Sequence, residues 1–125
     1  MKKILIAEDS PTMRSLIVST IDALGEYETV EAANGFEALR ILPREKVDLI
    51  ITDINMPHMD GMDFLGQLSQ RHPDLNVIMM TAFGGVDSYL EAMNLGAYEY
   101  LYKPVKLDDL RSVMHKIALE RANIA

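Results

Sequence analysis

Residues 47–57 read VDLIITDINMP, in which a mainly apolar run over residues 47–52 is followed by Asp53. The run is rich in β-branched and aliphatic side chains, which favours a buried strand over residues 47–52. Short runs of the same kind occupy residues 3–7, 27–32, 76–81 and 99–102. The chain is therefore predicted to contain five strands.

Segments with helical periodicity separate these runs. Between the first two strands, side chains recur at the three- and four-residue spacing of one helix face: Met13, Leu16, Ile17, Thr20, Ile21 and Leu24. Ser10 is placed to cap this helix, Pro11 suits its first position, and Gly25 provides its exit. The later helices are predicted over residues 35–42, about 62–71, about 86–94 and about 107–121.

The alternation of strands and helices predicts the fold class. Parallel neighbouring strands need crossover connections, and a helix after each strand supplies them. We expect a doubly wound α/β domain of the flavodoxin-like class, with a five-stranded parallel sheet and five helices. Because no linker or low-complexity tract interrupts the chain, residues 1–125 are expected to form a single domain, without room for a second one.

The composition excludes several classes of protein. Hydrophobic residues make up 49% of the chain and charged residues 25%, which is typical of a globular domain. The absence of cysteine excludes disulfides, thiolate metal sites and cysteine nucleophiles. A formal net charge of -7 repels nucleic acid and anionic lipid. The apolar start is too short for a signal peptide or a membrane span, so a cytoplasmic protein is expected.

Chemically active side chains lie at or directly after the ends of four predicted strands: Glu8 and Asp9, Asp53, Thr81, and Lys103 followed by Pro104. The carboxyl ends of parallel strands share one edge of a sheet, where ligands bind. Crowded carboxylates raise one another's pKa unless a cation neutralises them, and hard oxygen ligands suit Mg²⁺. With the metal bound, Asp53 stays ionised and can attack a phosphorus atom. Lys103 and Thr81 would then stabilise the phosphoryl oxygens.

These features resemble those of response-regulator receiver domains of the CheY type over essentially the whole chain. The resemblance rests on Glu8-Asp9-Ser10, Asp53-Ile54-Asn55-Met56-Pro57 with Gly61 beyond, Thr81-Ala82, and Lys103-Pro104 preceded by Tyr100. The family implies that Asp53 is the phosphoacceptor and that Thr81 and Lys103 respond to the phosphoryl group. It implies that Mg²⁺ is held by Glu8, Asp9, Asp53 and the backbone carbonyl of Asn55.

The resemblance further implies a switch. On phosphorylation Thr81 would move inward and Tyr100 would turn from an exposed to a buried rotamer, which changes the surface of the fourth helix, fifth strand and fifth helix. A cis peptide is implied before Pro104. The expected phosphodonor is a sensor histidine kinase, a phosphotransfer protein or a small phosphodonor, and a downstream protein would read the changed surface.

The family also implies a place in signalling. Residues 1–125 are then expected to be a stand-alone receiver domain of a two-component system or phosphorelay, with no output domain. Such a protein phosphorylates and dephosphorylates itself and is not a turnover enzyme.

Three positions depart from the commonest pattern or are expected to modify the chemistry of the site. Glu8 stands where the family often has Asp, and its longer side chain allows contact with the metal through a water. Asn55 and Phe83 flank the expected phosphoryl site, so they are expected to gate the attacking water and to set the lifetime of the phosphorylated state.

Other functions are weighed against this one. A phosphatase of the haloacid dehalogenase type also uses an aspartyl nucleophile with Mg²⁺, but it needs a second Asp where this chain has Asn55. A flavodoxin-type module must cradle a phosphate after its first strand, and Glu8 and Asp9 would repel it. A degenerate receiver that acts only as a constitutive interaction module stays open.

Overall fold

The computed structural model of the chain describes residues 3–56, 58–82 and 85–123. The strands are β1 (Lys3–Ala7), β2 (Glu28–Ala32), β3 (Leu49–Asp53), β4 (Asn76–Thr81) and β5 (Glu99–Tyr102). The helices are α1 (Pro11–Asp22), α2 (Gly35–Ile41), α3 (Gly61–Arg71), α4 (Val86–Asn94) and α5 (Leu107–Asn123). None of the described helices is long and apolar enough to cross a membrane.

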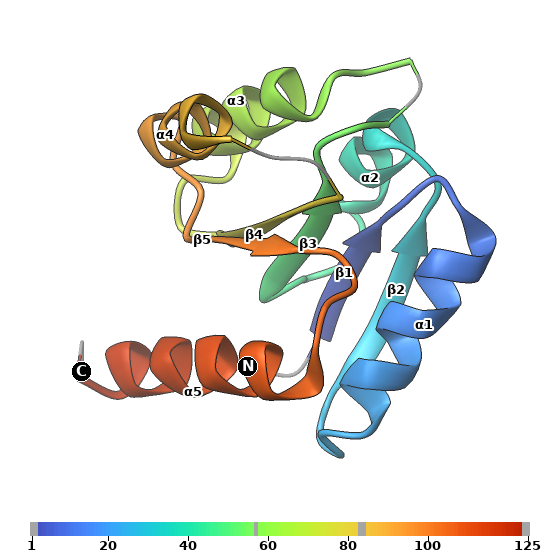
Figure 1. Ribbon diagram of the computed structural model, residues 1–125, viewed down its shortest axis with the longest axis vertical. Helices are drawn as coiled ribbons and strands as arrows, with labels where there is room; N and C mark the ends of the chain where they lie inside the picture. The colour runs from blue at the N-terminus through green and yellow to red at the C-terminus, as the bar shows by residue number, and fades with distance from the viewer. Residues whose placement is uncertain (1–2, 57, 83–84, 124–125) are drawn as a thin grey trace.

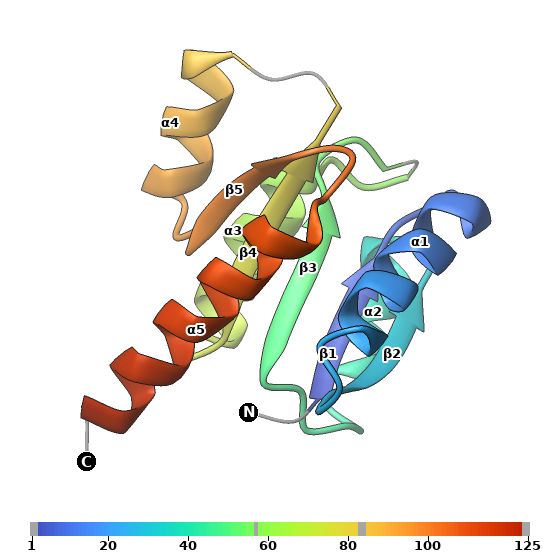
Figure 2. The ribbon, with the colours of Figure 1, turned by 60° about the horizontal axis from the view of Figure 1, so that its bottom comes forward.

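The strands form one parallel sheet in the order β2-β1-β3-β4-β5. Helices α1 and α5 cover one face, and α2, α3 and α4 cover the other (Figure 1). The predicted doubly wound fold with a five-stranded parallel sheet is therefore confirmed. In this register Ala7 of β1 lies opposite Thr52 of β3, and Thr81 of β4 lies opposite Tyr102 of β5. The carboxyl ends of these four strands consequently lie at the same edge (Figure 2).

The sheet separates two apolar clusters. In β3, Leu49 and Ile51 pack on the side of α1 and α5, whereas Ile50 packs on the side of α2, α3 and α4. Side chains alternate between the faces of a strand, so a parallel strand covered on both sides is apolar at nearly every position. This double burial explains why the apolar runs of the sequence locate the strands.

The periodicity of the sequence predicted a wider buried face for α1 than the structure shows. Ser10 caps the helix by accepting a hydrogen bond from the Met13 N–H over 3.2 Å, as predicted. Ile17 and Ile21 form the buried row, but Leu16, which was predicted to share it, is 55% exposed. Adjacent helical positions are about 100° apart, so the residue before a fully buried one points away from the sheet.

Strand β3 begins two residues later than predicted because Asp48 has another role. Its N–H donates to the Lys3 carbonyl over 2.8 Å, and its carboxylate accepts from the Lys3 N–H over 2.9 Å. These contacts tie the start of β1 to the segment that enters β3.

Candidate functional site

The carboxylates of Glu8, Asp9 and Asp53 lie together at the carboxyl edge of the sheet. One oxygen from each lies within 4.8 Å of the others. Glu8 and Asp9 directly follow β1, and Asp53 is the last residue of β3, which neighbours β1. Glu8 and Asp53 are buried, whereas Asp9 is exposed. The strand-end prediction therefore located three acidic groups that do meet.

The ammonium group of Lys103 joins the two buried carboxylates. Its Nζ lies 2.8 Å from Asp53 Oδ2 and 2.5 Å from Glu8 Oε1. Lys103 directly follows β5, and the peptide bond that joins it to Pro104 is cis, as predicted. Because water is largely excluded from these contacts, the ion pairs are stronger than surface ones, and either partner would be costly to leave alone.

The protonation behaviour of the site reflects burial and charge. Burial raises the pKa of Glu8. The neighbouring Asp9 and Asp53 raise the pKa of Glu8 further, and Lys103 opposes the rise. Burial lowers the pKa of Lys103, but its hydrogen bonds and ion pairs with Asp53 and Glu8 together raise it above the ordinary value. When all these groups are ionised, three carboxylates face one ammonium, so the group carries an excess of two negative charges. That excess fits a divalent cation, and carboxylate oxygens suit Mg²⁺.

The loop that follows β3 holds Asp53 from its backbone side. The Asn55 N–H donates to Asp53 Oδ1 over 3.1 Å, so both carboxylate oxygens of Asp53 have donors. The Gly61 N–H donates to the Ile54 carbonyl over 2.9 Å. A Cβ at Gly61 would lie 2.6 Å from the Ile54 Cα, so only glycine lets α3 begin this close to the loop. Pro57, in the same loop, lies outside the described residues.

Thr81 and Tyr100 occupy the interior beside this site. Thr81 is fully buried at the end of β4, and its carbonyl accepts from the Lys103 N–H over 2.7 Å. Tyr100 is 6% exposed, so the structure shows the inward position of the predicted switch residue. Burial raises the pKa of its phenol, against the effects of Thr81 and Ser88. The phenol oxygen nevertheless has no hydrogen bond of good geometry with any described residue.

Sequence reasoning missed Arg14, which contacts the acidic segment from α1. Its guanidinium donates to the Glu8 carbonyl over 2.7 Å and to Glu31 Oε1 over 3.0 Å. A cation near the start of a helix is an unusual choice, because the helix dipole disfavours it. That was the available signal, but Glu31 could be paired with Arg14 only once β2 was known to neighbour β1. Phe83, which was expected to gate the attacking water, lies outside the described residues.

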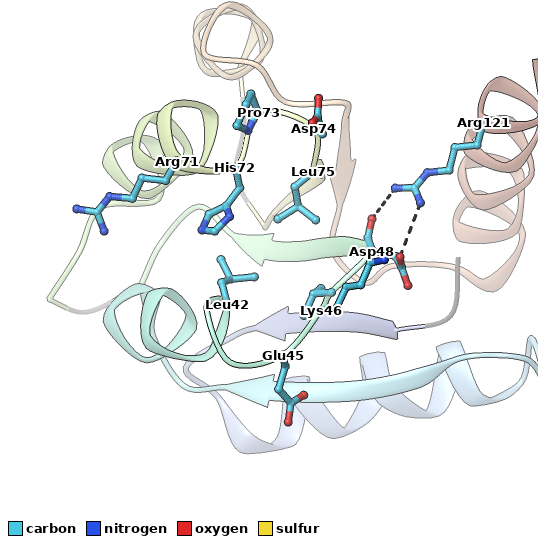
Figure 3. A pocket seen from close by; sticks show the side chains of 11 residues that line it. Leu42, Glu45, Lys46, Asp48, Arg71, His72, Pro73, Asp74, Leu75 and Arg121 are labelled. Atoms are coloured by element: carbon cyan, nitrogen blue, oxygen red, sulfur yellow. Dashed lines mark hydrogen bonds and ion pairs between the residues drawn. The ribbon is translucent and has the colours of Figure 1, made fainter. Parts of the chain in front are cut away.

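A separate hollow lies at the opposite, amino edge of the sheet (Figure 3). The loops before β3 and β4 line it together with Arg121 of α5. Arg121 donates to the Asp48 carbonyl over 2.8 Å and to Asn76 Oδ1 over 3.1 Å. These contacts fasten the end of α5 to the sheet, and the strand-end residues of the acidic site do not line the hollow.

Comparison with known proteins identifies the family. Residues 4–115 match the model of the response regulator receiver domain. Sporulation initiation phosphotransferase F of Bacillus subtilis is 35% identical over 122 residues, which cover 98% of this chain and 98% of that protein. The response regulator protein FleR of Pseudomonas aeruginosa is 41% identical over 117 residues, which cover 94% of this chain. The chain spans only 24% of the length of FleR.

The similarity extends to solved structures. A response regulator receiver domain protein from Clostridium thermocellum superposes with a TM-score of 0.90 at 32% identity, and the match covers all of both chains. A CheY-like receiver domain protein from Methanospirillum hungatei also gives a TM-score of 0.90, at 27% identity, over 100% of this chain and 99% of that one. The family model, the relatives and the solved structures agree with one another, and the chain belongs to the response regulator receiver domain family.

Proposed function

We propose that the protein is a phosphorylation-dependent switch of two-component signalling in which Asp53 accepts the phosphoryl group. The observation that carries this proposal is the environment of the Asp53 carboxylate. Its two oxygens are held by Lys103 Nζ and the Asn55 N–H, and the carboxylates of Glu8 and Asp9 lie beside it. Hydrogen-bond donors in fixed positions orient the Asp53 carboxylate for nucleophilic attack. The same donors can stabilise the oxygens of the phosphorylated side chain.

The residues present fit a Mg²⁺ ion. Glu8, Asp9, Asp53 and the backbone carbonyl of Asn55 would hold it, since they supply hard oxygen donors and an excess of negative charge. When bound, the ion supplies positive charge that offsets the carboxylates and the phosphoryl oxygens. Lys103 supplies part of the same compensation from the protein side.

In the proposed reaction an oxygen of Asp53 forms a bond to phosphorus while the bond from phosphorus to the donor breaks. The donor, an imidazole of a histidine kinase or the acetate of acetyl phosphate, leaves with the electron pair of that bond. Lys103 can follow the new phosphoryl oxygens because it already contacts Asp53. The Thr81 hydroxyl would donate a hydrogen bond to one of them, which would draw the end of β4 inward.

The proposed output surface surrounds Tyr100. The Tyr100 ring lies 5.7 Å from the Tyr89 ring of α4 and 5.8 Å from the Tyr102 ring of β5. Tyr102 is 58% exposed, and Val86 and Leu90 of α4 are 73% and 52% exposed. A change in the position of Tyr100 would therefore alter an apolar surface formed by α4 and β5, with α5 beside it. Receiver domains interact with histidine kinases and downstream effectors, and we propose that a downstream protein binds this surface.

Incubation with acetyl phosphate tests the proposal directly. We expect the intact mass to increase by one phosphoryl group when Mg²⁺ is present and to stay unchanged when a chelator removes it. A folded protein that binds Mg²⁺ but never gains the group would instead favour the degenerate receiver. Hydrolysis of p-nitrophenyl phosphate at many turnovers per protein molecule would favour the phosphatase, and we expect none, because Asn55 cannot act as its general acid.

Removal of the exposed carboxylate should change metal binding and stability in opposite directions. In Asp9→Asn the repulsion of Glu8 is relieved, so the unfolding free energy without metal should rise by up to about 1 kcal/mol. The loss of the negative charge on this ligand should weaken Mg²⁺ binding at least about tenfold. Urea unfolding and calorimetric titration measure the two effects, with Asp74→Asn at the far edge of the sheet as the control. A fall in both quantities would contradict this account.

A further inference from the structure

The backbone of Glu8 is held at both its N–H and its carbonyl group by neighbouring elements, and the carbonyl belongs to the peptide that links Glu8 to Asp9. The Glu8 N–H donates to the Ala32 carbonyl at the end of β2 over 3.0 Å. The Glu8 carbonyl accepts from the guanidinium of Arg14 over 2.7 Å. Because a peptide unit is planar, an oriented Glu8 carbonyl also fixes the direction in which the chain continues to Asp9.

This restraint matters because Asp9 stands at the exposed rim of the acidic group. Glu8 is fixed by burial and by Lys103, and Asp53 is fixed by Lys103 and Asn55. Asp9 is exposed and is not fixed by burial, so the direction of its carboxylate depends mainly on the backbone from which it projects. A ligand held only loosely costs conformational entropy when a metal binds.

Glu31 keeps Arg14 in place. Its Oε1 accepts from Arg14 Nε over 3.0 Å, and it lies on β2 opposite Ile6 of β1. The Arg14 side chain is only 19% exposed, although a free arginine on a helix surface would extend into water. The pair also balances the charge of Arg14, so that Arg14 can act as a brace next to a cation site with little repulsion of the cation.

The position of Arg14 gives little support to the helix itself. Arg14 lies near the start of α1, where the positive end of the helix dipole disfavours a cation, and the first turn contains no acidic residue. The geometry is therefore better explained by the contact with Glu8 than by helix stability.

We propose that Arg14 is a positioning residue that sets the affinity of the acidic group for Mg²⁺ by fixing the Glu8–Asp9 peptide. The inference rests on the proposed function, because it assumes that the acidic group binds Mg²⁺. The proposal predicts that the loss of the positive charge of Arg14 lowers the affinity for Mg²⁺, which is opposite to the effect of charge alone. Coulomb's law alone predicts that loss of a positive charge near the site strengthens cation binding, whereas loss of a positioning contact weakens it.

The test compares the wild type with Arg14→Met, Arg14→Lys and Glu31→Gln. Arg44→Met is the matched control, because Arg44 is exposed and lies in the loop before β3, at the opposite edge of the sheet. In the metal-free proteins, NMR reports the carbonyl shift of Glu8 and the amide shift of Asp9. Mg²⁺ titration then gives the dissociation constant, and urea unfolding reports stability independently.

We expect Arg14→Met to move both shifts and to weaken Mg²⁺ binding about tenfold. Glu31→Gln should weaken binding less, because its amide oxygen can still accept from Arg14. Arg14→Lys should be intermediate, since one ammonium cannot reproduce the two separate guanidinium contacts. Arg44→Met should match the wild type. If Arg14→Met does not fold, Arg14→Lys and Glu31→Gln still decide the question.

Two results would overturn the inference separately from the proposed function. Unchanged or tighter Mg²⁺ binding in folded Arg14→Met, with a normal wild type, would leave Arg14 with a purely structural role. Full wild-type affinity in Arg14→Lys would show that the paired guanidinium contacts with Glu8 and Glu31 do not set the affinity. A wild type that binds no Mg²⁺ at all would overturn both proposals together.

Discussion

Replacement of Asp53 with asparagine is expected to abolish phosphoryl transfer from acetyl phosphate while the protein stays folded. The amide cannot form an acyl phosphate, but its size and its carbonyl oxygen are retained, so the hydrogen bond from the Asn55 N–H can persist. Lys103 keeps its contact with Glu8 in the variant. Intact mass after incubation with acetyl phosphate and Mg²⁺ measures the loss, and circular dichroism confirms the fold.

The matched control for this variant is Asp74→Asn. Asp74 is exposed in the turn before β4, at the opposite edge of the sheet, so its replacement makes the same chemical change without touching the site. The control should gain one phosphoryl group like the wild type. A phosphoryl group that still appears on Asp53→Asn would place the acceptor on another residue and refute the proposed reaction.

Replacement of Lys103 with methionine is expected to damage both stability and phosphoryl transfer. The buried carboxylates of Glu8 and Asp53 would lose their cation, which should lower the unfolding free energy at neutral pH by about 3 kcal/mol. The rate of phosphorylation should fall about 10²-fold, because one group that stabilises the transferred charge is removed. Urea unfolding and the time course of the mass change measure the two effects.

The loss of stability in Lys103→Met should depend on pH. In metal-free wild type the pKa of Glu8 is raised on folding, so the folded state binds more protons than the unfolded state between the two pKa values. The contribution of Glu8 to stability therefore falls as pH rises through that window, and removal of Lys103 should deepen the fall. At acid pH, where the carboxylates are protonated, the variant should approach the wild type.

A matched control separates this effect from a general change of charge. Lys46 is exposed in the loop before β3, and Lys46→Met should leave both stability and phosphorylation close to those of the wild type. Equal stability losses for Lys103→Met at acid and neutral pH would contradict the ion-pair explanation.

The pattern of apolar runs in the sequence predicted the fold, because strands that are buried on both faces are apolar at nearly every position. The bounds of β1, β4 and β5 were predicted correctly, since their apolar runs stop where the polar edge residues begin. Helix periodicity was less selective at Leu16, because a helix touches the sheet along a narrower stripe than its apolar residues occupy. Asp48 was misassigned to a strand because its partner, the Lys3 backbone, lies on another strand.

The site was predictable to the extent that topology alone assembles it. Strand ends bring Asp9, Asp53 and Lys103 to one edge, whatever the details of packing. The brace formed by Arg14 and Glu31 was not predictable, because it depends on the angle at which α1 crosses β2. The side-chain rotamer of Tyr100 was also not predictable, because it depends on neighbouring side chains that the periodicity of the sequence does not describe.

The division of the core by the sheet has a consequence for how the protein can change. Apolar side chains on the two faces belong to separate clusters, so changes in them share few direct partners. The energetic costs of one substitution on each face, such as Ile117→Val and Leu65→Val, should therefore add. The face that contains Tyr100 and α4 can therefore change in evolution to suit a different binding partner, while the packing of α1 and α5 stays the same.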